Sequence, residues 1–475
     1  MNGRSHIGHG TPVNALVLVP PFLKYASGPL LGPAMLAGAA RKAGHRIQIL
    51  DLAREWMMAH YAEPWSESAF VGDHDKPSED LLRIQQDWCS LCAQAWPHEL
   101  DSEQHAERIM HMKAGFGEVE AAARVLCHTE IGAWFKRKIS QTTTPELVGI
   151  SVLYSGQVVA ALALTHLVKA KWPSVPVVWG GAHVTALGEE ISRDRRYGSC
   201  ADGFVFGYAE KTWVELLDSV ANGLSWPQEV IRAGEGYRRA KDDPGIVPYF
   251  GTPVAWGGRL TLPAQSSRGC AYGRCAFCTY PAIEGSLRNL DLGPVRAVVV
   301  EAERCAAAMS FKDSLATIDR LNELSNLIAG RVPWSACTKL HSRLNADFLR
   351  QLRAAGCHTL EVGLETLTDS GQAIILKRQA PELFLAFLDA AAVAGVSVVV
   401  NYITGLPGTG PDDEQQWLAK VQAEIGARRN LVAKVEHNTF QLERLSPMGK
   451  QPDKFGLVVT GSWPWASVLD WKPAA

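Results

Sequence analysis

Short apolar runs alternate with helix-like stretches in the first part of the chain. Residues 15–19 are an apolar run typical of a buried strand, and a turn rich in glycine and proline (20–32) separates them from a helix-period stretch that ends at Lys42. Gly44 suits the end of a helix, and a second strand is expected at 46–51. This order predicts one strand–helix–strand unit of an open parallel sheet.

The same alternation resumes after Thr144. Strands are expected at 147–152, 175–181 and 203–207, with helices at 159–171 and 211–221. The combined pattern predicts an α/β domain with a doubly wound, Rossmann-like sheet, which we place at residues 10–235. Such sheets bind ligands at the carboxyl ends of their strands.

A mostly polar, helix-period insertion, about residues 56–144, divides this sheet in the sequence. Its possible core positions are Met110, Met112, Phe116, Val119 and Val125. Its role is open: it could form a helical cap over a cofactor or a substrate. Its Cys89 and Cys92 match a redox or zinc half-site, but no second pair follows, so a packed helix face is favoured.

A second series of strands, each followed by a helical stretch, begins near residue 260. Strands are expected at 260–265, 307–311, 334–339, 359–364, 397–403 and 435–442. Six such units predict a partial (β/α)6 barrel at residues 245–445, with its active site at the C-terminal ends of the strands. A short tail, 446–475, follows, and its tryptophans could close the barrel or wall a substrate channel; closure is favoured.

Composition narrows the class of protein. The net charge is −2 and no basic run is present, which argues against nucleic acid and favours a small-molecule or peptide partner. No apolar stretch reaches the length of a membrane span, and the first residues lack the apolar core of a signal peptide. We therefore expect a cytoplasmic protein, in which cysteines indicate metal or catalytic groups before disulfides.

Three of the ten cysteines, Cys270, Cys275 and Cys278, lie together directly after the first barrel strand. Thiolates prefer soft metal centres, and a loop that contains glycine can wrap around an iron–sulfur cluster. Structural zinc and electron-transfer clusters usually take four protein ligands, so three ligands leave one iron open. A different metal with a fourth ligand from Cys305, Cys337 or Cys357 is the alternative.

This cysteine loop resembles that of the radical S-adenosylmethionine (SAM) superfamily. The resemblance implies a [4Fe–4S] cluster whose open iron is chelated by SAM, and an external one-electron reductant of the flavodoxin or ferredoxin type. The family usually has three residues between the first two cysteines, whereas this chain has four, and Phe277 matches the usual aromatic residue. Strand-end residues at the family's SAM-binding positions are Asp313, Lys339, Glu365, Asn401 and Gly405; surface ion pairing is the alternative for the charged ones.

The first sheet resembles the cobalamin-binding domain that precedes many radical SAM cores. The resemblance implies that residues at the strand ends contact cobalamin, namely Ser151, Tyr154, Gly180, Gly181, His183, Thr185 and Gly207. A generic Rossmann-like sheet without the cofactor is the alternative. The Asp-x-His-x-x-Gly stretch that supplies a cobalt ligand in some cobalamin domains is missing from the chain. His183 is therefore expected to line the pocket, or else to be a solvated loop residue.

Together the two resemblances predict a cobalamin-dependent radical SAM enzyme. The expected reaction is methylation of an unactivated carbon in a peptide or natural product, through a 5′-deoxyadenosyl radical and methylcobalamin. Two alternatives stay open: a radical enzyme with an empty or auxiliary cobalamin-like domain that performs cyclisation, epimerisation or carbon–sulfur chemistry, and a non-catalytic iron–sulfur regulator. The sequence does not identify the substrate.

Overall fold

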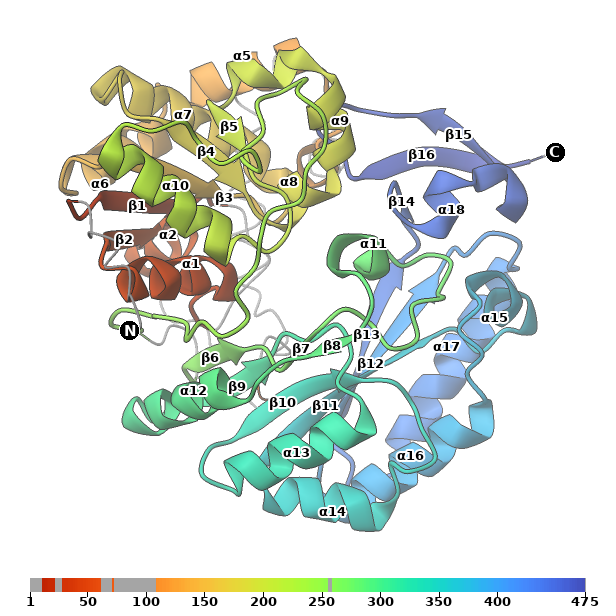
Figure 1. Ribbon diagram of the computed structural model, residues 1–475. Helices are drawn as coiled ribbons and strands as arrows, with labels where there is room; N and C mark the ends of the chain where they lie inside the picture. Colours follow the sequence, from red (N-terminus) through yellow and green to blue (C-terminus); the bar gives the residue numbers. More distant parts are fainter. Residues whose placement is uncertain (1–10, 22–27, 61–70, 72–107, 255–258, 475) are drawn as a thin grey trace, which may run out of the picture.

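The first sheet of the computed structural model has five parallel strands in the order β2-β1-β3-β4-β5 (Figure 1). The structure describes residues 11–21, 28–60, 71, 108–254 and 259–474. The strands are β1 (Asn14–Val19), β2 (Arg46–Asp51), β3 (Leu147–Ser151), β4 (Val177–Gly180) and β5 (Gly203–Phe204). The doubly wound sheet predicted from the alternation is confirmed, since β1 and β3 are buried on both faces as expected for parallel strands.

Helices cover both faces of this sheet and create two separate cores. One face carries α1 (Leu31–Lys42) and α10 (Glu210–Asn222), and the other carries α5 (Phe116–Leu126), α6 (Glu130–Ser140) and α7 (Val158–Lys171). The remaining helices are short: α2 (Leu52–His60), α8 (Ala182–Ala186) and α9 (Gly188–Arg193). Helices α5, α6 and α10 each bury one side and expose the other, whereas α7 is buried along almost its whole length.

The described part of the insertion forms helices that belong to the first core. Helix α5 packs against α7, and Met112 and Val119 are fully buried there. Met110 and Val125 are 48% and 43% exposed, so their expected core positions are wrong. Helices α5 and α6 thus cover one face of the sheet instead of a ligand site, while Cys89 and Cys92 lie outside the described residues.

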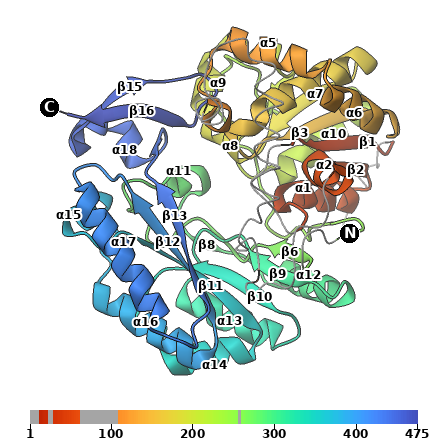
Figure 2. The ribbon, with the colours of Figure 1, turned by 180° about the vertical axis from the view of Figure 1, so that it is seen from behind.

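The second sheet has six parallel strands in the order β13-β12-β11-β10-β9-β6 (Figures 1 and 2). The strands are β6 (Thr261–Ala264), β9 (Ala308–Phe311), β10 (Trp334–Thr338), β11 (Cys357–Glu365), β12 (Ser397–Thr404) and β13 (Ala433–Thr439). Its helices are α12 (Gly293–Arg304), α13 (Ile318–Ile328), α14 (Ala346–Ala354), α15 (Asp369–Ile375), α16 (Pro381–Ala394) and α17 (Pro411–Gly426). The apolar side chains of the strands pack outward against these helices, which confirms the partial barrel.

A small hairpin that the hydrophobic pattern did not predict encloses the cysteine loop. Strand β7 (Ser267–Arg268) pairs with β8 (Arg288–Asn289), and the connection between them contains the three cysteines and α11 (Tyr280–Glu284). Two-residue strands are too short to show a period, so only their pairing in the folded chain reveals them. The hairpin places the cysteine loop above the C-terminal ends of the barrel strands.

The C-terminal segment forms an antiparallel sheet that contacts both domains (Figure 2). Its elements are β14 (Leu442–Glu443), α18 (Pro447–Lys450), β15 (Leu457–Gly461) and β16 (Val468–Pro473). Trp465 is 1% exposed within the core of the first domain, where it packs edge-on against Tyr197. Leu442 and Met448 instead pack with Ala276 of the cysteine loop. The tail is therefore a bridge between the domains, more than the simple closure of the barrel that was favoured. In the described part of the chain, no helix is long and apolar enough to cross a membrane.

Candidate functional site

A largely apolar cavity of about 280 Å³ lies at the carboxyl ends of the first sheet. Its walls in the first domain come from the ends of β1, β3, β4 and β5, from the start of α1 and from one face of α10. Its remaining wall comes from the second domain, through Gln265, Arg268, Ile283, Glu284 and Lys312. The cavity thus lies at the position where doubly wound sheets bind ligands, and it opens toward the hairpin that carries the cysteines.

Five of the residues expected at the cobalamin site line this cavity: Ser151, Gly180, Gly181, Thr185 and Gly207. Gly181 has φ +108°, and a Cβ there would lie 2.3 Å from the carbonyl oxygen of Val152. Thr185 joins two strand ends, because its Oγ1 donates to the carbonyl oxygen of Gly181 (2.9 Å) and accepts from the N–H of Gly207 (2.8 Å). The glycines therefore let two loops approach closely around the cavity.

Two observations bear on what this cavity could hold. A Cβ at Gly32 would meet no atom within 4 Å, so the start of α1 leaves the cavity open. Trp213 lines the cavity, and its buried indole N–H finds no acceptor among the described residues. A bound molecule with an amide or carboxylate oxygen would satisfy this donor. The residues present therefore fit a cobalamin.

His183 and Tyr154 do not line the cavity. His183 is buried and its Nε2 lies 3.0 Å from the carbonyl oxygen of Trp465 in the C-terminal segment. Burial lowers its pKa to about 4. Both readings of His183, pocket lining and solvated loop, are therefore wrong, because α8 turns its side chain away from the cavity. The Tyr154 side chain is 51% exposed.

The cysteine loop is held from two sides. The N–H of Ala276 donates to the carbonyl oxygen of Ile375 (2.9 Å), and its carbonyl oxygen accepts from the N–H of Met448 (3.0 Å). Gly269 has φ +79°, and a Cβ there would lie 2.3 Å from the carbonyl oxygen of Ser286. Phe277 packs with this same tail core. The loop geometry thus needs both the α15 end and the C-terminal segment.

The three cysteines are free, half-buried and close enough to influence one another's charge. Burial and the neighbouring thiolates Cys275 and Cys270 raise the pKa of Cys278 to about 12. Among the described residues, no three His, Cys, Asp or Glu side chains converge on one metal ion. Three thiolates fit a [4Fe–4S] cluster with one open iron, whereas a structural zinc site usually takes four protein ligands.

The possible fourth ligands differ in where they lie. Cys357 is buried in the outer core of the barrel, and the Sγ of Cys305 lies 3.6 Å from Oε1 of Glu301 on α12. Cys337 is near enough to Cys270 for their charges to interact. Only Cys337 of these three therefore shares the surroundings of the cysteine loop.

Charged side chains from the barrel strands gather beside this loop. Lys377 Nζ lies 2.6 Å from Glu365 Oε1, and both side chains are about nine-tenths buried. Burial opposes the charge on Lys377, but the Glu365 carboxylate outweighs this effect and raises the pKa of the lysine. Lys339 Nζ donates to the Lys377 carbonyl oxygen (3.1 Å) and lies 3.4 Å from the ring centroid of Tyr272. This cluster brings together the predicted Lys339 and Glu365.

Tyr272 and Gly273 lie between the first two cysteines of the loop. Gly273 adopts a left-handed conformation with φ +59°. The Tyr272 hydroxyl donates to the carbonyl oxygen of Leu376, a residue that itself has a positive φ of 58°. The Tyr272 ring thus contacts Lys339, and its hydroxyl contacts the segment after α15.

The other predicted SAM contacts have protein partners. The Asp313 carboxylate accepts from the N–H groups of Ser266 (2.8 Å) and Ser267 (2.5 Å) and from the Ser266 hydroxyl. Its contacts thus hold the start of the cysteine hairpin. Asn401 Nδ2 donates to Glu361 Oε1 (2.6 Å), and the N–H of Gly405 donates to Glu414 Oε2 (2.7 Å). These residues shape the barrel mouth.

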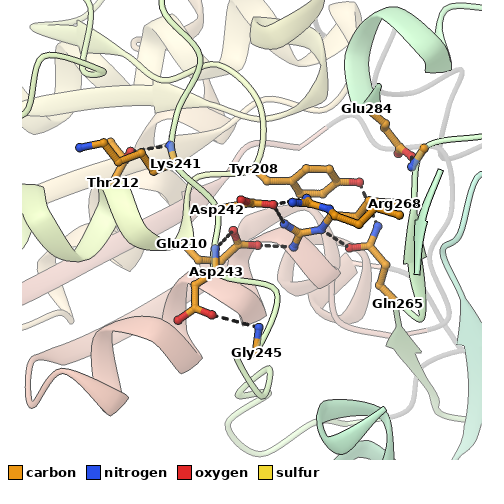
Figure 3. A network of polar contacts seen from close by, with 12 residues as sticks. Tyr208, Glu210, Thr212, Lys241, Asp242, Asp243, Gly245, Gln265, Arg268 and Glu284 are labelled. Atoms are coloured by element: carbon orange, nitrogen blue, oxygen red, sulfur yellow. Dashed lines mark hydrogen bonds and ion pairs between the residues drawn. The ribbon is translucent and has the colours of Figure 1, made fainter. Parts of the chain in front are cut away.

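Sequence reasoning missed a buried network at the boundary between the domains (Figure 3). Arg268 is 1% exposed and its guanidinium contacts Glu210, Asp242 and Gln265, while Tyr208 stacks against it. The charged residues are far apart in the sequence, so no local pattern indicates their pairing. The only signal was the position of Arg268, two residues before the first cysteine.

Comparison with known proteins agrees with this geometry. The B12 binding domain family model matches residues 135–217, and the Radical SAM superfamily model matches residues 265–420. An uncharacterized methyltransferase from Pyrococcus horikoshii is 24% identical over 57% of this chain and 62% of its own length. The bacteriochlorophyllide d C-8(2)-methyltransferase of Chlorobaculum tepidum is 23% identical over 64% of this chain and 68% of its own length. This chain thus spans less than two thirds of the first relative.

Two solved structures share the fold. The methyltransferase TsrM from Kitasatospora setae, with cobalamin and a [4Fe–4S] cluster bound, aligns with 98% of this chain and 84% of its own at a TM-score of 0.62 and 14% identity. OxsB, with aqua-cobalamin and SAM bound, aligns with 98% of this chain and 64% of its own at a TM-score of 0.62 and 11% identity. The chain therefore contains a B12-binding domain followed by a Radical SAM superfamily domain, and it shares the fold of TsrM and OxsB.

Proposed function

We propose that this enzyme transfers a methyl group to an unactivated carbon of a small-molecule or peptide substrate. The observation that carries the proposal is a shared wall: Arg268 and Glu284 line the cavity of the first domain and also hold the hairpin of the cysteine loop. Relatives named methyltransferases support the reaction type. When bound, a cluster with SAM supplies a carbon radical, and cobalamin supplies a transferable methyl group.

The residues of the chain have separate tasks in this proposal. Cys270, Cys275 and Cys278 would hold the cluster. Lys339 would bind a carboxylate, because an ammonium group suits that charge, and Glu365 would keep the neighbouring Lys377 ammonium in place. The open cavity at Gly32 and the unsatisfied N–H of Trp213 would receive the cobalamin.

The tail and the loops would position the reacting groups and limit access of water. Phe277 and Met448 belong to the apolar cluster that packs the tail against the cysteine loop. Exclusion of water protects reactive species from side reactions. Electrons would come from an external one-electron donor of the flavodoxin or ferredoxin type, as for other enzymes that use this chemistry.

Anaerobic reconstitution with iron, sulfide and cobalamin tests the proposal. We expect bound cobalamin, SAM-dependent formation of 5′-deoxyadenosine, and a labelled product when SAM carries a trideuterated methyl group. Protein without bound cobalamin would contradict methyl transfer and favour a radical enzyme of another reaction type. Absence of 5′-deoxyadenosine, with the cluster intact, would favour the iron–sulfur regulator.

A matched pair of cysteine variants tests the cluster ligands. Cys275→Ala should lose most of its iron and all 5′-deoxyadenosine formation, because only two of the three thiolates would remain to hold the cluster. Cys305→Ala is the control, since Cys305 caps the end of α12 beside Glu301, apart from the loop. Equal iron content in the two variants would contradict the assignment of the loop.

A further inference from the structure

Arg268 connects three parts of the chain that meet at the domain boundary (Figure 3). Its Nη2 lies 2.6 Å from Glu210 Oε1 at the start of α10, and its Nη1 lies 2.9 Å from Asp242 Oδ2 in the segment between the domains. Its Nε donates to Gln265 Oε1 at the end of β6 (3.0 Å). The planar fork of a guanidinium suits such a junction, since each nitrogen has its own acceptor.

Asp242 also neutralises a pair of like charges in the hairpin. Arg268 on β7 is the cross-strand partner of Arg288 on β8, and the Nη2 of Arg288 contacts the same Asp242 carboxylate. Like charges directly opposite each other destabilise a strand pair. The hairpin that encloses the cysteines is therefore closed by a carboxylate from outside the barrel.

The same junction forms part of the cavity wall. Tyr208 lines the cavity, and the Arg268 guanidinium lies 3.6 Å from its ring centroid. The Tyr208 hydroxyl accepts from Gln265 Nε2 (2.9 Å). Glu284, which also lines the cavity, accepts from the N–H of Gly269 (3.0 Å), the residue before Cys270. A molecule in the cavity that contacts Tyr208 or Glu284 thus contacts a residue that holds the start of the cysteine loop.

Building on the proposed function, we propose that Arg268 is a positioning residue that couples occupancy of the cavity to binding of SAM at the cluster. The stack on Tyr208 and the ion pairs with Glu210 and Asp242 fix the base of the hairpin relative to the cavity. A filled cavity holds Tyr208 in place, and the hairpin then keeps the arrangement that binds SAM. Because coupling of two ligands is reciprocal, SAM tightens cobalamin binding by the same factor.

The experiment measures a thermodynamic cycle on protein that contains its cluster. The dissociation constant of SAM is determined by equilibrium dialysis under anaerobic conditions, with and without saturating hydroxocobalamin. The cobalamin dissociation constant is determined from its absorbance, with and without SAM. Wild-type protein should show a coupling factor of about fivefold or more in both directions.

Asp242→Asn is the principal variant, because Asp242 is partly exposed and the change keeps its shape. It should bind both molecules but reduce the coupling factor to below about twofold. Arg268→Lys keeps the charge but loses the fork and should act in the same way. Arg331→Gln, which removes an exposed ion pair with Glu303, is the control and should keep the wild-type factor.

Each outcome bears on one proposal. A wild-type protein that binds both molecules without coupling overturns the role of Arg268, as does an Asp242→Asn protein with the wild-type factor. A wild-type protein that binds neither molecule overturns the proposed function instead. A control that loses coupling as strongly as Asp242→Asn would assign the effect to general destabilisation and also reject the inference.

Discussion

The burial of His183 predicts a specific dependence of stability on pH. His183 Nε2 lies 3.0 Å from the Trp465 carbonyl oxygen, so the N–H of the neutral imidazole donates a hydrogen bond to the tail. Burial lowers the pKa of His183 from 6.5 to about 4, and the nearby Arg444 contributes in the same direction. The perturbation to test is His183→Gln, because a glutamine amide can donate to the same carbonyl and does not titrate.

The direction and size of the effect follow from the two pKa values. The unfolded chain takes up a proton near pH 6.5, whereas the folded chain does so only near pH 4. The folded state therefore keeps its full stability above pH 6.5 and loses stability as the pH falls from 6.5 to 4. Between pH 7.5 and pH 5.5 this loss is about 1.3 kcal/mol in the free energy of unfolding.

Urea unfolding of the two proteins at both pH values measures this loss. Other titrating groups contribute equally to both proteins, so the difference between the two losses isolates His183. We expect the wild-type protein to lose about 1.3 kcal/mol more than His183→Gln on going to pH 5.5. Equal losses would refute the reasoning, because they would mean that burial does not keep His183 neutral in the folded protein.

Three further changes test other parts of the structure. Gly32→Phe should fill the cavity and abolish retention of cobalamin at unchanged iron content, whereas Gly117→Phe on the exposed side of α5 should not; retention by both variants, measured by absorbance, would contradict the cavity assignment. Lys377→Met should cost about 3 kcal/mol, because it leaves the Glu365 carboxylate buried without its partner; an unchanged melting temperature would argue against that pair. Tyr272→Leu should weaken SAM binding about threefold by removing the cation–π contact, whereas Tyr272→Phe should have little effect; equal dissociation constants for the two variants would exclude a role for the ring.

The two sheets could be predicted because their strands follow one another along the chain. Each buried strand, such as 147–151, is a short apolar run followed by a helix of regular period, and such units allow few topologies. The three cysteines were also visible, since a local loop carries all the ligands. The strand-end glycines Gly180, Gly181 and Gly207 line the cavity because the carboxyl ends of parallel strands meet at one edge of the sheet.

The side-chain contacts could not be predicted in the same way. Asp313 has the right position for a ligand residue, but Ser266 and Ser267 use its carboxylate. His183 follows a glycine pair at a strand end, yet its partner Trp465 lies in the tail. Arg268 has partners from three separate segments. In each case the contact depends on residues that are distant in sequence, and no period or spacing records them.

The place of Trp465 has a consequence for how the protein reaches its folded state. Domains generally fold as units during synthesis, with the N-terminal one first. Here the core of the first domain contains an indole that is synthesised only after the whole barrel. Until then the space around Tyr197 and Trp179 lacks its filling side chain, so the first domain stays incompletely packed. The tail thus makes completion of one domain depend on synthesis of the other, and a nascent chain cannot assemble a finished cofactor cavity before the cysteine loop exists.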